Sequence, residues 1–345
     1  MQTHQPYLPV GHYVNELQAQ PSFVRSPLGT GFFSHSDCHL HSMGADHPEC
    51  AARLSAIDDR LLGTGVVDAL VSVDAPLAKL SDLHLAHTPE HIAHLIEVSQ
   101  RLSLEANDLT GLGSYQLDPD TSMNVHTWQA ALRSAGAAMA AVDAVMNGVL
   151  ANAFCATRPP GHHAKRDQAM GFCFLSNVAL AARYAQAIHG VERVAIIDFD
   201  VHHGNGTQDV VQGLPGIEMF SFFQHPFYPY DQPFNGSANL HNIPVPAYSR
   251  GDAIRAVVSE QWLPALHMFK PELLLISAGF DAHRDDDLGQ LGLVEADYAW
   301  MTQVLMQVAN SHSKGRIVSC LEGGYELRSL STSVEAHIRV LADLD

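Results

Sequence analysis

Short runs of apolar residues alternate along this chain with longer segments of helical character. The apolar runs are continuous, as in strands whose two faces are both buried in a parallel sheet. We predict such strands at 153–156, 194–197, 219–222, 273–276 and 316–320. Helices are predicted at 127–147, 177–189, 251–268 and 295–312, with Gly148 and Gly190 just beyond the first two. Ser176 stands where a helix N-cap is expected.

The order of these elements predicts the fold class. Strands that alternate with helices indicate an α/β protein with a mainly parallel central sheet and helices on both faces. Residues 1 to about 30 contain prolines and little periodicity, so we expect an extended arm or loop there. No linker, low-complexity tract or internal repeat follows, and residues 1–345 are predicted to form a single domain.

Composition and charge exclude several classes of protein. Hydrophobic residues make up 46% and charged residues only 16%, which favours a large core over a disordered or coiled-coil chain. The net charge of −18 argues against general nucleic-acid binding and favours cationic substrates. The five cysteines are scattered without a CxxC pair, which indicates a reducing compartment. Neither a signal peptide nor an apolar run of about 18 residues is present, and we expect a soluble cytoplasmic protein.

Four of the predicted strands run directly into polar clusters. These clusters are Arg-Pro-Pro-Gly-His-His at 158–163, Asp-Phe-Asp-Val-His-His-Gly-Asn-Gly at 198–206, Ser-Ala-Gly-Phe-Asp at 277–281 and Leu-Glu-Gly-Gly-Tyr at 321–325. In open α/β sheets, ligands bind beyond the carboxyl ends of the strands. We therefore expect the four clusters to converge on one site.

The second cluster has the spacing of a metal site. Asp198, Asp200 and His202 are two residues apart and project to one side of an extended backbone. Two carboxylates and an imidazole in that arrangement need a cation, and zinc accepts both ligand types. Asp200, His202 and a third ligand such as Asp281 would leave a coordination position open, as in catalytic zinc sites. The alternative is a set of solvated loop carboxylates.

Three further residues have side chains suited to acid–base and oxyanion chemistry. His162 and His163 can divide proton transfer if their partners set their protonation states differently. The phenol of Tyr325 can donate a hydrogen bond to an oxyanion. Outside this context a His-His pair or a Gly-Gly-Tyr turn is a weak signal, because the chain has 22 histidines and such turns often serve packing alone.

Taken in order, these clusters resemble the histone deacetylase and acetylpolyamine amidohydrolase superfamily. Gly-Phe-Cys-Phe-Leu-Ser-Asn at 171–177 adds to the resemblance, and His47-Pro48-Glu49 with Arg53 is similar to the family's first loop. The resemblance covers the chain from about residue 30 to its end. It implies the three-layer arginase-like α/β fold and a zinc-dependent hydrolase acting on linear amides.

The resemblance also implies a role for each matching residue. Zinc would be bound by Asp200, His202 and Asp281. His163 would be the principal base and acid, with His162 as its electrostatic partner, Asp198 behind His162, and Tyr325 as oxyanion donor. Asn205, where class I members usually carry Asp, together with Arg158-Pro159-Pro160 indicates the class II branch. The residues expected to border the substrate are Gly171, Phe172, Gly324 and either Tyr228 or Phe227. The residues expected to hold potassium are Asp198, Asp200, His202, Ser221 and Phe222.

Two loops leave alternatives open. The histidines and cysteines between His35 and Cys50 could bind a structural zinc, although their spacing fits no standard finger and a rim loop is the preferred interpretation. Asp285, Asp286 and Asp287 are expected to form a solvated acidic loop, or else to attract cationic substrates. Leu288 follows them where relatives that prefer polyamines carry an acidic residue, which favours an acyl-lysine substrate.

The sequence therefore predicts an enzyme that deacylates N-acyl amines, most simply acyl-lysine side chains, through water activated at zinc. The alternatives are an acetylpolyamine or other small-amide amidohydrolase, a catalytically silent acyl-lysine reader or scaffold, and a binuclear manganese enzyme of the arginase type. The intact set of Asp200, His202, Asp281, His163 and Tyr325 argues against the silent protein. No sequence pattern decides whether residues 1–30 pack on another subunit of a homo-oligomer.

Overall fold

The structure, a computed structural model, describes residues 28–106, 113–230 and 235–344. The predicted N-terminal arm lies outside the described residues apart from Leu28, Gly29 and Thr30, and Thr30 already begins a strand. Within the described part of the chain, no helix combines the length and apolarity needed to cross a membrane.

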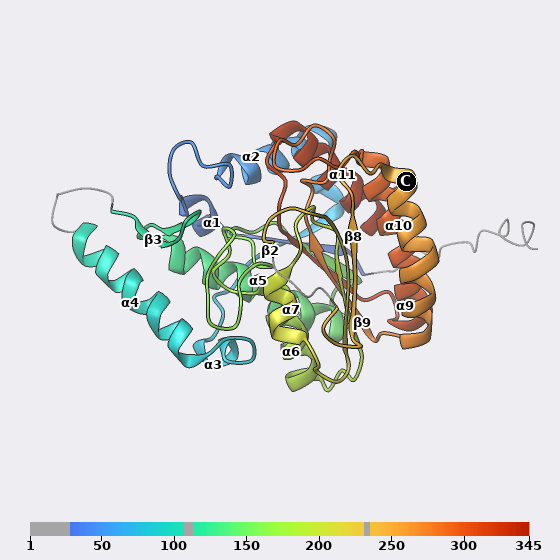
Figure 1. Ribbon diagram of the computed structural model, residues 1–345, viewed down its shortest axis with the longest axis horizontal. Coiled ribbons are helices and arrows are strands. Elements are labelled where there is room, and N and C mark those ends of the chain that lie inside the picture. Colours follow the sequence, from blue (N-terminus) through green and yellow to red (C-terminus); the bar gives the residue numbers. More distant parts are fainter. Residues whose placement is uncertain (1–27, 107–112, 231–234, 345) are drawn as a thin grey trace, which may run out of the picture.

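An eight-stranded sheet runs through the middle of the molecule (Figure 1). Its strand order is β2-β1-β5-β10-β9-β6-β7-β8, and every neighbouring pair is parallel. The strands are β1 (Thr30–Ser34), β2 (Leu70–Asp74), β5 (Asn152–Cys155), β6 (Val194–Asp198), β7 (Ile217–Gln224), β8 (Leu240–Val245), β9 (Leu273–Ala278) and β10 (Ile317–Leu321). A separate antiparallel pair consists of β3 (Tyr115–Asp118) and β4 (Thr121–Met123).

The five predicted strands and the fold class are confirmed. Each of the five lies among the inner strands, and four of them, β5, β6, β9 and β10, are buried at every residue. The pattern did not reveal β1, β2 or β8. The edge strand β2 is mostly exposed, and the other edge strand, β8, contains Pro244, so neither has the continuous apolar run of an inner strand.

Helices connect most of the strands. They are α1 (Asp37–Leu40), α2 (Ala52–Thr64), α3 (Leu80–Leu83), α4 (Pro89–Ala106), α5 (Thr127–Met146), α6 (Asn177–His189), α7 (Asn205–Val211), α8 (Gly251–Val257), α9 (Leu263–Phe269), α10 (Glu295–His312) and α11 (Leu327–Leu341). A short 3-10 helix, η1 (Val66–Ala69), precedes β2. The predicted helices at 177–189 and 295–312 have the predicted bounds.

Two local predictions differ from the structure. The predicted helix 251–268 is α8 and α9 joined by a π-helical turn, η2 (Val258–Trp262), beside Pro264, whose ring cannot fit a regular helix interior. Ser176 precedes α6 as expected, but its side chain makes no capping hydrogen bond. Gly190 does end α6 in the left-handed conformation, with φ of 64°.

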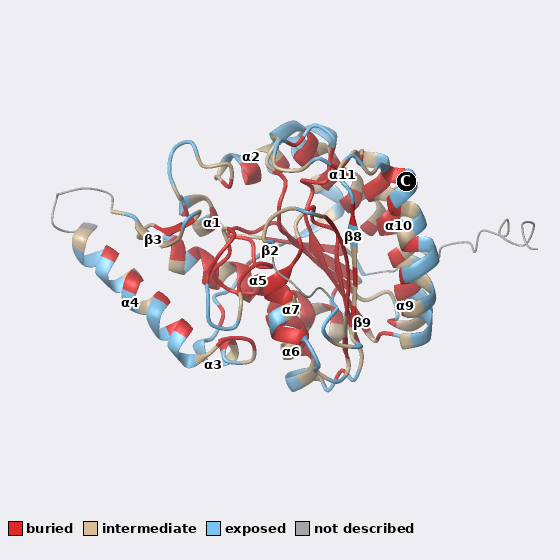
Figure 2. Cartoon of the chain, in the orientation of Figure 1, coloured by how far each residue is buried: buried red, intermediate tan, exposed pale blue. Residues whose placement is uncertain are grey.

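Both faces of the sheet are covered, and its inner strands lie in the interior (Figure 2). One core contains apolar side chains of α4, α5 and α6, and the other contains those of α2, α10 and α11. The helices α4 and α10 each have buried residues on one side and exposed residues on the other, as Figure 2 shows. In such an arrangement, a site is expected beyond the ends of the strands.

Gly136 provides a test of how tightly the α5 face is packed. A Cβ atom at this position would lie 1.9 Å from the carbonyl oxygen of Pro76, in the backbone segment that crosses α5. We expect Gly136→Ala to lower the free energy of unfolding by about 1–3 kcal/mol or more, because the backbone must move. Urea denaturation would measure the change.

The matched control is Gly63→Ala in the exposed part of α2, where a Cβ atom would meet nothing within 4 Å. This variant should be as stable as the wild type or slightly more stable, because alanine is the better helix former. Equal stability of Gly136→Ala and the wild type would contradict the close contact.

Candidate active site and metal centre

The carboxyl ends of neighbouring strands bring three potential metal ligands together. Asp200 and His202 follow β6, and Asp281 follows β9, the strand beside it. One ligand atom from each residue lies within 4.8 Å of the others. No other group of three His, Cys, Asp or Glu side chains within the described ranges meets this condition.

The surroundings of these three residues fit a metal ion. Asp200 and Asp281 are completely buried, and Nδ1 of His202 lies 3.1 Å from Oδ1 of Asp200 and 3.2 Å from Oδ2 of Asp281. Burial and the charge of Asp200 raise the pKa of Asp281 to about 7. A cation between the carboxylates would relieve both effects, and a mixed carboxylate and imidazole set suits zinc.

Two glycines allow the carboxylates to approach the backbone. A Cβ atom at Gly279 would lie 2.0 Å from Oδ2 of Asp200, and one at Gly323 would lie 2.0 Å from Oδ2 of Asp281. The amide of Gly323 donates to Oδ2 of Asp200 at 2.9 Å, and the amide of Val201 donates to Oδ1 of Asp281 at 2.9 Å. These contacts orient each carboxylate before a metal binds.

The adjacent histidines have different partners. Nδ1 of His162 lies 3.1 Å from Oδ2 of Asp198, and its Nε2 lies 3.8 Å from Oδ2 of Asp200. Nδ1 of His163 lies 2.7 Å from Oδ1 of the neutral Asn205. The two rings are 4.0 Å apart between centroids.

These partners give the two histidines opposite protonation tendencies. Burial lowers the pKa of His162, but the charges of Asp200 and Asp198 outweigh it and hold the pKa well above its usual range. Burial and the positive charges of His162 and His202 hold the pKa of His163 well below its usual range. His163 is therefore suited to accept a proton and His162 to remain cationic.

Glu322 is a site residue for which the sequence analysis gave no role. Its Oε2 accepts hydrogen bonds from the amides of Gly161 at 2.7 Å and His162 at 3.0 Å, and its Oε1 accepts from Oγ of Ser277 at 3.2 Å. Burial raises the pKa of this carboxyl to about 7. Glu322 thus fixes the turn that presents the two histidines. Only its place in the Glu-Gly-Gly-Tyr motif marked it in the sequence.

Tyr325 faces the same site from the end of β10. Its ring packs edge to face on Phe172 at 5.9 Å, and the guanidinium of Arg53 lies 5.0 Å from its centroid. Its amide donates to Oδ2 of Asp286 at 2.6 Å, and the amide of Glu326 donates to the same oxygen at 3.0 Å.

The prediction of a solvated acidic loop is therefore wrong for Asp286, which is buried. Asp285 and Asp287 are exposed, but Asp286 is only 3% exposed and also accepts from the amide of Leu288 at 2.9 Å. The three backbone donors explain why a carboxylate is buried in this position. Sequence pattern alone does not distinguish the middle residue of three consecutive aspartates.

A cavity of about 250 Å³ opens beside these groups. Its lining residues are Asp120, His163, Gly171, Phe172, His202, Phe227, Tyr228, Tyr230, Asp287, Leu288 and Tyr325. Five residues that the sequence analysis assigned to substrate binding are among them: Gly171, Phe172, Phe227, Tyr228 and Leu288.

Other residues differ from that expectation. Gly324 is not among the described residues that line the cavity, and its carbonyl accepts from Nε of Arg53 at 2.6 Å. Asp120, Tyr230 and Asp287 line the cavity although the sequence analysis assigned none of them to it individually. Asp120 lies in the turn between β3 and β4, far in sequence from the strand ends that guided the prediction.

Two of the residues expected to hold potassium, Asp200 and His202, are also candidate metal ligands. Asp198 on β6 is paired in register with Ser221 on β7. Ser221 is buried and its hydroxyl lies 3.4 Å from the carbonyl oxygen of Phe222. The five residues expected at this position therefore come from two adjoining strands and the loop after β6.

The loop between His35 and Cys50 gathers no group of three metal ligands within the described residues. Its Glu49 is instead completely buried between Arg53 and Arg158. Glu49 accepts from Nη1 of Arg53 at 3.0 Å and from both Nε and Nη2 of Arg158, the latter at 2.7 Å. Arg53 also donates to the carbonyl of Glu322 at 2.5 Å. This ion cluster joins the first loop to the ends of β5 and β10.

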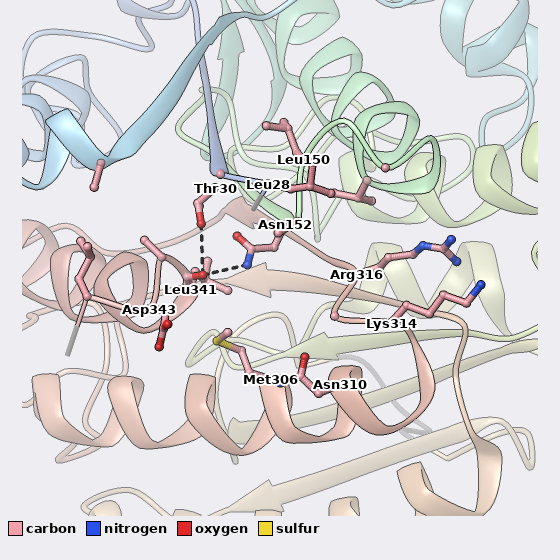
Figure 3. A pocket seen from close by; sticks show the side chains of 18 residues that line it. Leu28, Thr30, Leu150, Asn152, Met306, Asn310, Lys314, Arg316, Leu341 and Asp343 are labelled. Carbon is pink, nitrogen blue, oxygen red and sulfur yellow. Dashed lines mark hydrogen bonds between the residues drawn. The ribbon is translucent and has the colours of Figure 1, made fainter. Parts of the chain in front are cut away.

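A larger cavity, of about 550 Å³, lies near the opposite ends of several strands (Figure 3). Thr30 and Asn152, which begin β1 and β5, both donate to the carbonyl of Leu341 there, at 3.2 Å and 2.8 Å. Its charged lining residues, Lys314, Arg316 and Asp343, include none of the candidate metal ligands. We therefore place the active site in the smaller cavity, at the carboxyl ends of the strands.

Comparisons with known proteins identify relatives of this chain. Residues 47–341 match the family model described as Histone deacetylase domain. The chain is 37% identical over 290 residues to the Histone deacetylase-like amidohydrolase of Pseudomonas aeruginosa, covering 81% of this chain and 72% of that protein. It is 36% identical over 334 residues to the Polyamine deacetylase HDAC10 of Mus musculus, covering 91% of this chain and 48% of that protein.

A solved structure has the same fold. The crystal structure of the HDA15 HD domain aligns with a TM-score of 0.84 and 33% sequence identity. The alignment covers 92% of this chain and 90% of that chain.

Gly279 provides a test of the metal centre. We expect Gly279→Ala to abolish high-affinity binding of zinc, because a Cβ atom 2.0 Å from Oδ2 would displace the Asp200 carboxylate. The number of zinc ions bound per chain after dialysis would measure the effect, with Gly63→Ala as a control expected to bind as the wild type does. Equal zinc content in Gly279→Ala and the wild type would show that the ion is held elsewhere.

Proposed function

The chain belongs to the histone deacetylase family, a family of hydrolases, and from this premise we propose that it is a zinc-dependent amidohydrolase that deacylates amines such as the lysine side chain. One observation carries the proposal. The Asp200, His202 and Asp281 group adjoins a single cavity that is also lined by His163 and Tyr325. A metal centre, a base and a phenol on one cavity are the parts that hydrolysis of an unactivated amide needs.

We propose that Asp200, His202 and Asp281 hold the zinc ion. When bound, zinc supplies Lewis-acid polarisation of the amide carbonyl and lowers the pKa of a water molecule. We also propose a structural potassium ion held by Asp198, Asp200, His202, Ser221 and Phe222. The register that pairs Asp198 with Ser221 supports this second assignment.

His163 would move the protons of the reaction. Its low pKa keeps the imidazole neutral and able to accept the proton of the attacking water. Asn205 fixes the orientation of the ring through Nδ1, so Nε2 is left for proton transfer. The same imidazole would then protonate the departing amine. His162, held cationic by Asp198 and Asp200, would stabilise negative charge that develops nearby.

Tyr325 would donate its phenolic proton in a hydrogen bond to the oxyanion. Burial and the charge of Asp281 hold the pKa of this phenol well above its usual range, so it remains a donor. Asp286 accepts a hydrogen bond from the Tyr325 amide, and Arg53 contacts the Tyr325 ring. Fixed donors of this kind stabilise a transition state without reorganisation.

The shape of the cavity favours a slender aliphatic amine. Phe172, Phe227 and Tyr228 give it aromatic walls around the approach to His163 and His202. Such walls suit the methylene chain of an acylated lysine. Leu288 adds an apolar surface at the same cavity. Asn205 and the Arg158-Pro159-Pro160 motif support assignment to the class II branch.

A second candidate substrate is an acetylated polyamine. Asp120 and Asp287 also line the cavity, and no Lys or Arg is among its described lining residues. These carboxylates would attract an amine that carries a further positive charge. The resemblance to proteins named Polyamine deacetylase HDAC10 also supports a polyamine substrate.

We propose a reducing, cytoplasmic location for either activity, because all five cysteines are free thiols.

Chelation of zinc and substitution of His163 and Tyr325 test the reaction class. We expect hydrolysis of an acetyl-lysine fluorogenic peptide to stop with a chelator and to return with added zinc. His163→Ala should lose about 10²–10⁴-fold in kcat and Tyr325→Phe about 10²–10³-fold, with zinc content unchanged.

A trifluoroacetyl-lysine peptide run in parallel would show how well the enzyme handles an unactivated amide. Near-normal turnover by His163→Ala would overturn its role as the base. No turnover of acyl-lysine or acetylated polyamine by the zinc-loaded wild type would favour a silent acyl-lysine reader.

Substitution of Asp287 tests the choice between the two substrates. If the cavity selects a second positive charge, Asp287→Asn should raise KM about 2–5-fold for acetylated spermidine or putrescine and leave acetyl-lysine peptides unchanged. The effect should diminish at high salt, because Asp287 is exposed.

Asp285→Asn is the matched control. Asp285 is also exposed and carries the same charge, but it is not among the described residues that line the cavity. An equal change in both variants would mean that only the overall charge acts, and no change in either would leave acyl-lysine as the better candidate.

A further inference from the structure

Two buried histidines lie outside the cavity, His87 in the turn between α3 and α4 and His91 in the first turn of α4. His87 is 3% exposed and His91 is 4% exposed, and their rings lie 5.0 Å apart between centroids. They contact the loop that runs from Ala164 to Ser176, which follows the catalytic histidine pair and precedes α6.

Four hydrogen bonds join this turn and the start of α4 to both ends of the loop. At the start of the loop, Nδ1 of His87 lies 3.0 Å from the carbonyl of Lys165, and the amide of Thr88 donates to the carbonyl of Arg166 at 2.8 Å. At its end, the amide of Ser176 donates to Nε2 of His87 at 2.9 Å. Nε2 of His91 lies 2.9 Å from the carbonyl of Phe174.

The partners of His87 determine its tautomer. The Ser176 amide is a donor, so Nε2 of His87 must offer a lone pair. The Lys165 carbonyl is an acceptor, so Nδ1 must carry the proton. A neutral imidazole is therefore required, and burial lowers the pKa of His87 to about 3. One side chain thus connects residues 11 positions apart in the loop.

The middle of the loop forms part of the cavity. Gly171 packs directly on the base, since a Cβ atom there would lie 2.5 Å from Cδ2 of His163. Phe172 has a φ of 68° and contacts the ring of Tyr325. A shift of the loop would therefore move the cavity wall, and it would change the packing around the base and the phenol.

We propose that His87 is a positioning residue for the deacylation reaction, holding the 164–176 loop so that Gly171 and Phe172 fix His163 and Tyr325 in their working places. The inference rests on the proposed function. It assigns His87 no contact with the substrate, since His87 is not among the described residues that line the cavity. The alternative is a purely structural role, in which His87 only stabilises the fold.

Substitutions that remove one hydrogen bond at a time separate these alternatives. Asn at position 87 can place a donor near the Nδ1 position, and Gln can place an acceptor near the Nε2 position. His87→Asn should thus keep the contact to Lys165, and His87→Gln the contact to Ser176. His87→Leu removes both. His84→Gln, at an exposed position three residues earlier, is the control.

The measurement is kcat and KM on an acetyl-lysine peptide, normalised to folded, zinc-loaded protein, together with zinc content and thermal stability. We expect zinc content to stay at the wild-type value, because the ligands follow β6 and β9. We expect kcat to fall about 10–100-fold in His87→Leu and less in His87→Asn and His87→Gln. His84→Gln should match the wild type.

A purely structural role predicts a different pattern. Variants that melt at lower temperature but keep the wild-type kcat and KM per folded, zinc-loaded molecule would overturn the proposal. If His87→Leu does not fold, the Asn and Gln variants decide the matter, since each keeps one hydrogen bond. A wild type without turnover would instead overturn the proposed function itself.

Discussion

Two completely buried carboxylates, Asp200 and Asp281, impose a constraint that much of the surrounding structure meets. Charges removed from water need a partner of opposite sign and hydrogen-bond donors. The parallel pairing of β6 with β9 delivers both carboxylates to the same edge of the sheet. Gly279 and Gly323 let the backbone approach them, and backbone amides bind the oxygens. The remaining need is for a cation, and this need is the physical reason for proposing a metal centre at this edge.

A second group of buried charges, on Glu49, Arg53 and Arg158, stabilises that geometry. Glu49 lies between Arg53 and Arg158, and Arg53 donates in turn to the carbonyls of Glu322 and Gly324. The cluster thus connects the first loop with the strand ends that carry the histidine pair and Tyr325. Loss of one member would leave an uncompensated charge in the interior, which is strongly destabilising. These ion pairs therefore fix the position of the first loop more precisely than apolar contacts alone would.

The sequence predicted the parts of this structure whose signals are local. Inner strands such as β9 are continuous apolar runs, and the spacing of Asp198, Asp200 and His202 is visible in five residues. The roles of Glu322 and Asp286 were not predictable in this way. Each is defined by backbone amides that come from other segments, and such contacts leave no periodic or compositional trace. The edge strand β2 was missed for the related reason that exposure weakens the apolar pattern.

Buried groups determine the proposed reaction, whereas exposed groups influence which substrate is preferred. His163, Asp200 and Asp281 are buried, and their electrostatic interactions are strong because water is excluded. Asp287 is exposed and adjoins Leu288, so one side chain favours a cationic amine and the next favours an aliphatic one. Exposed charges interact weakly and are screened by salt. Selectivity set by such residues should be graded, so an enzyme of this construction would accept several acyl amines and differ among them mainly in KM.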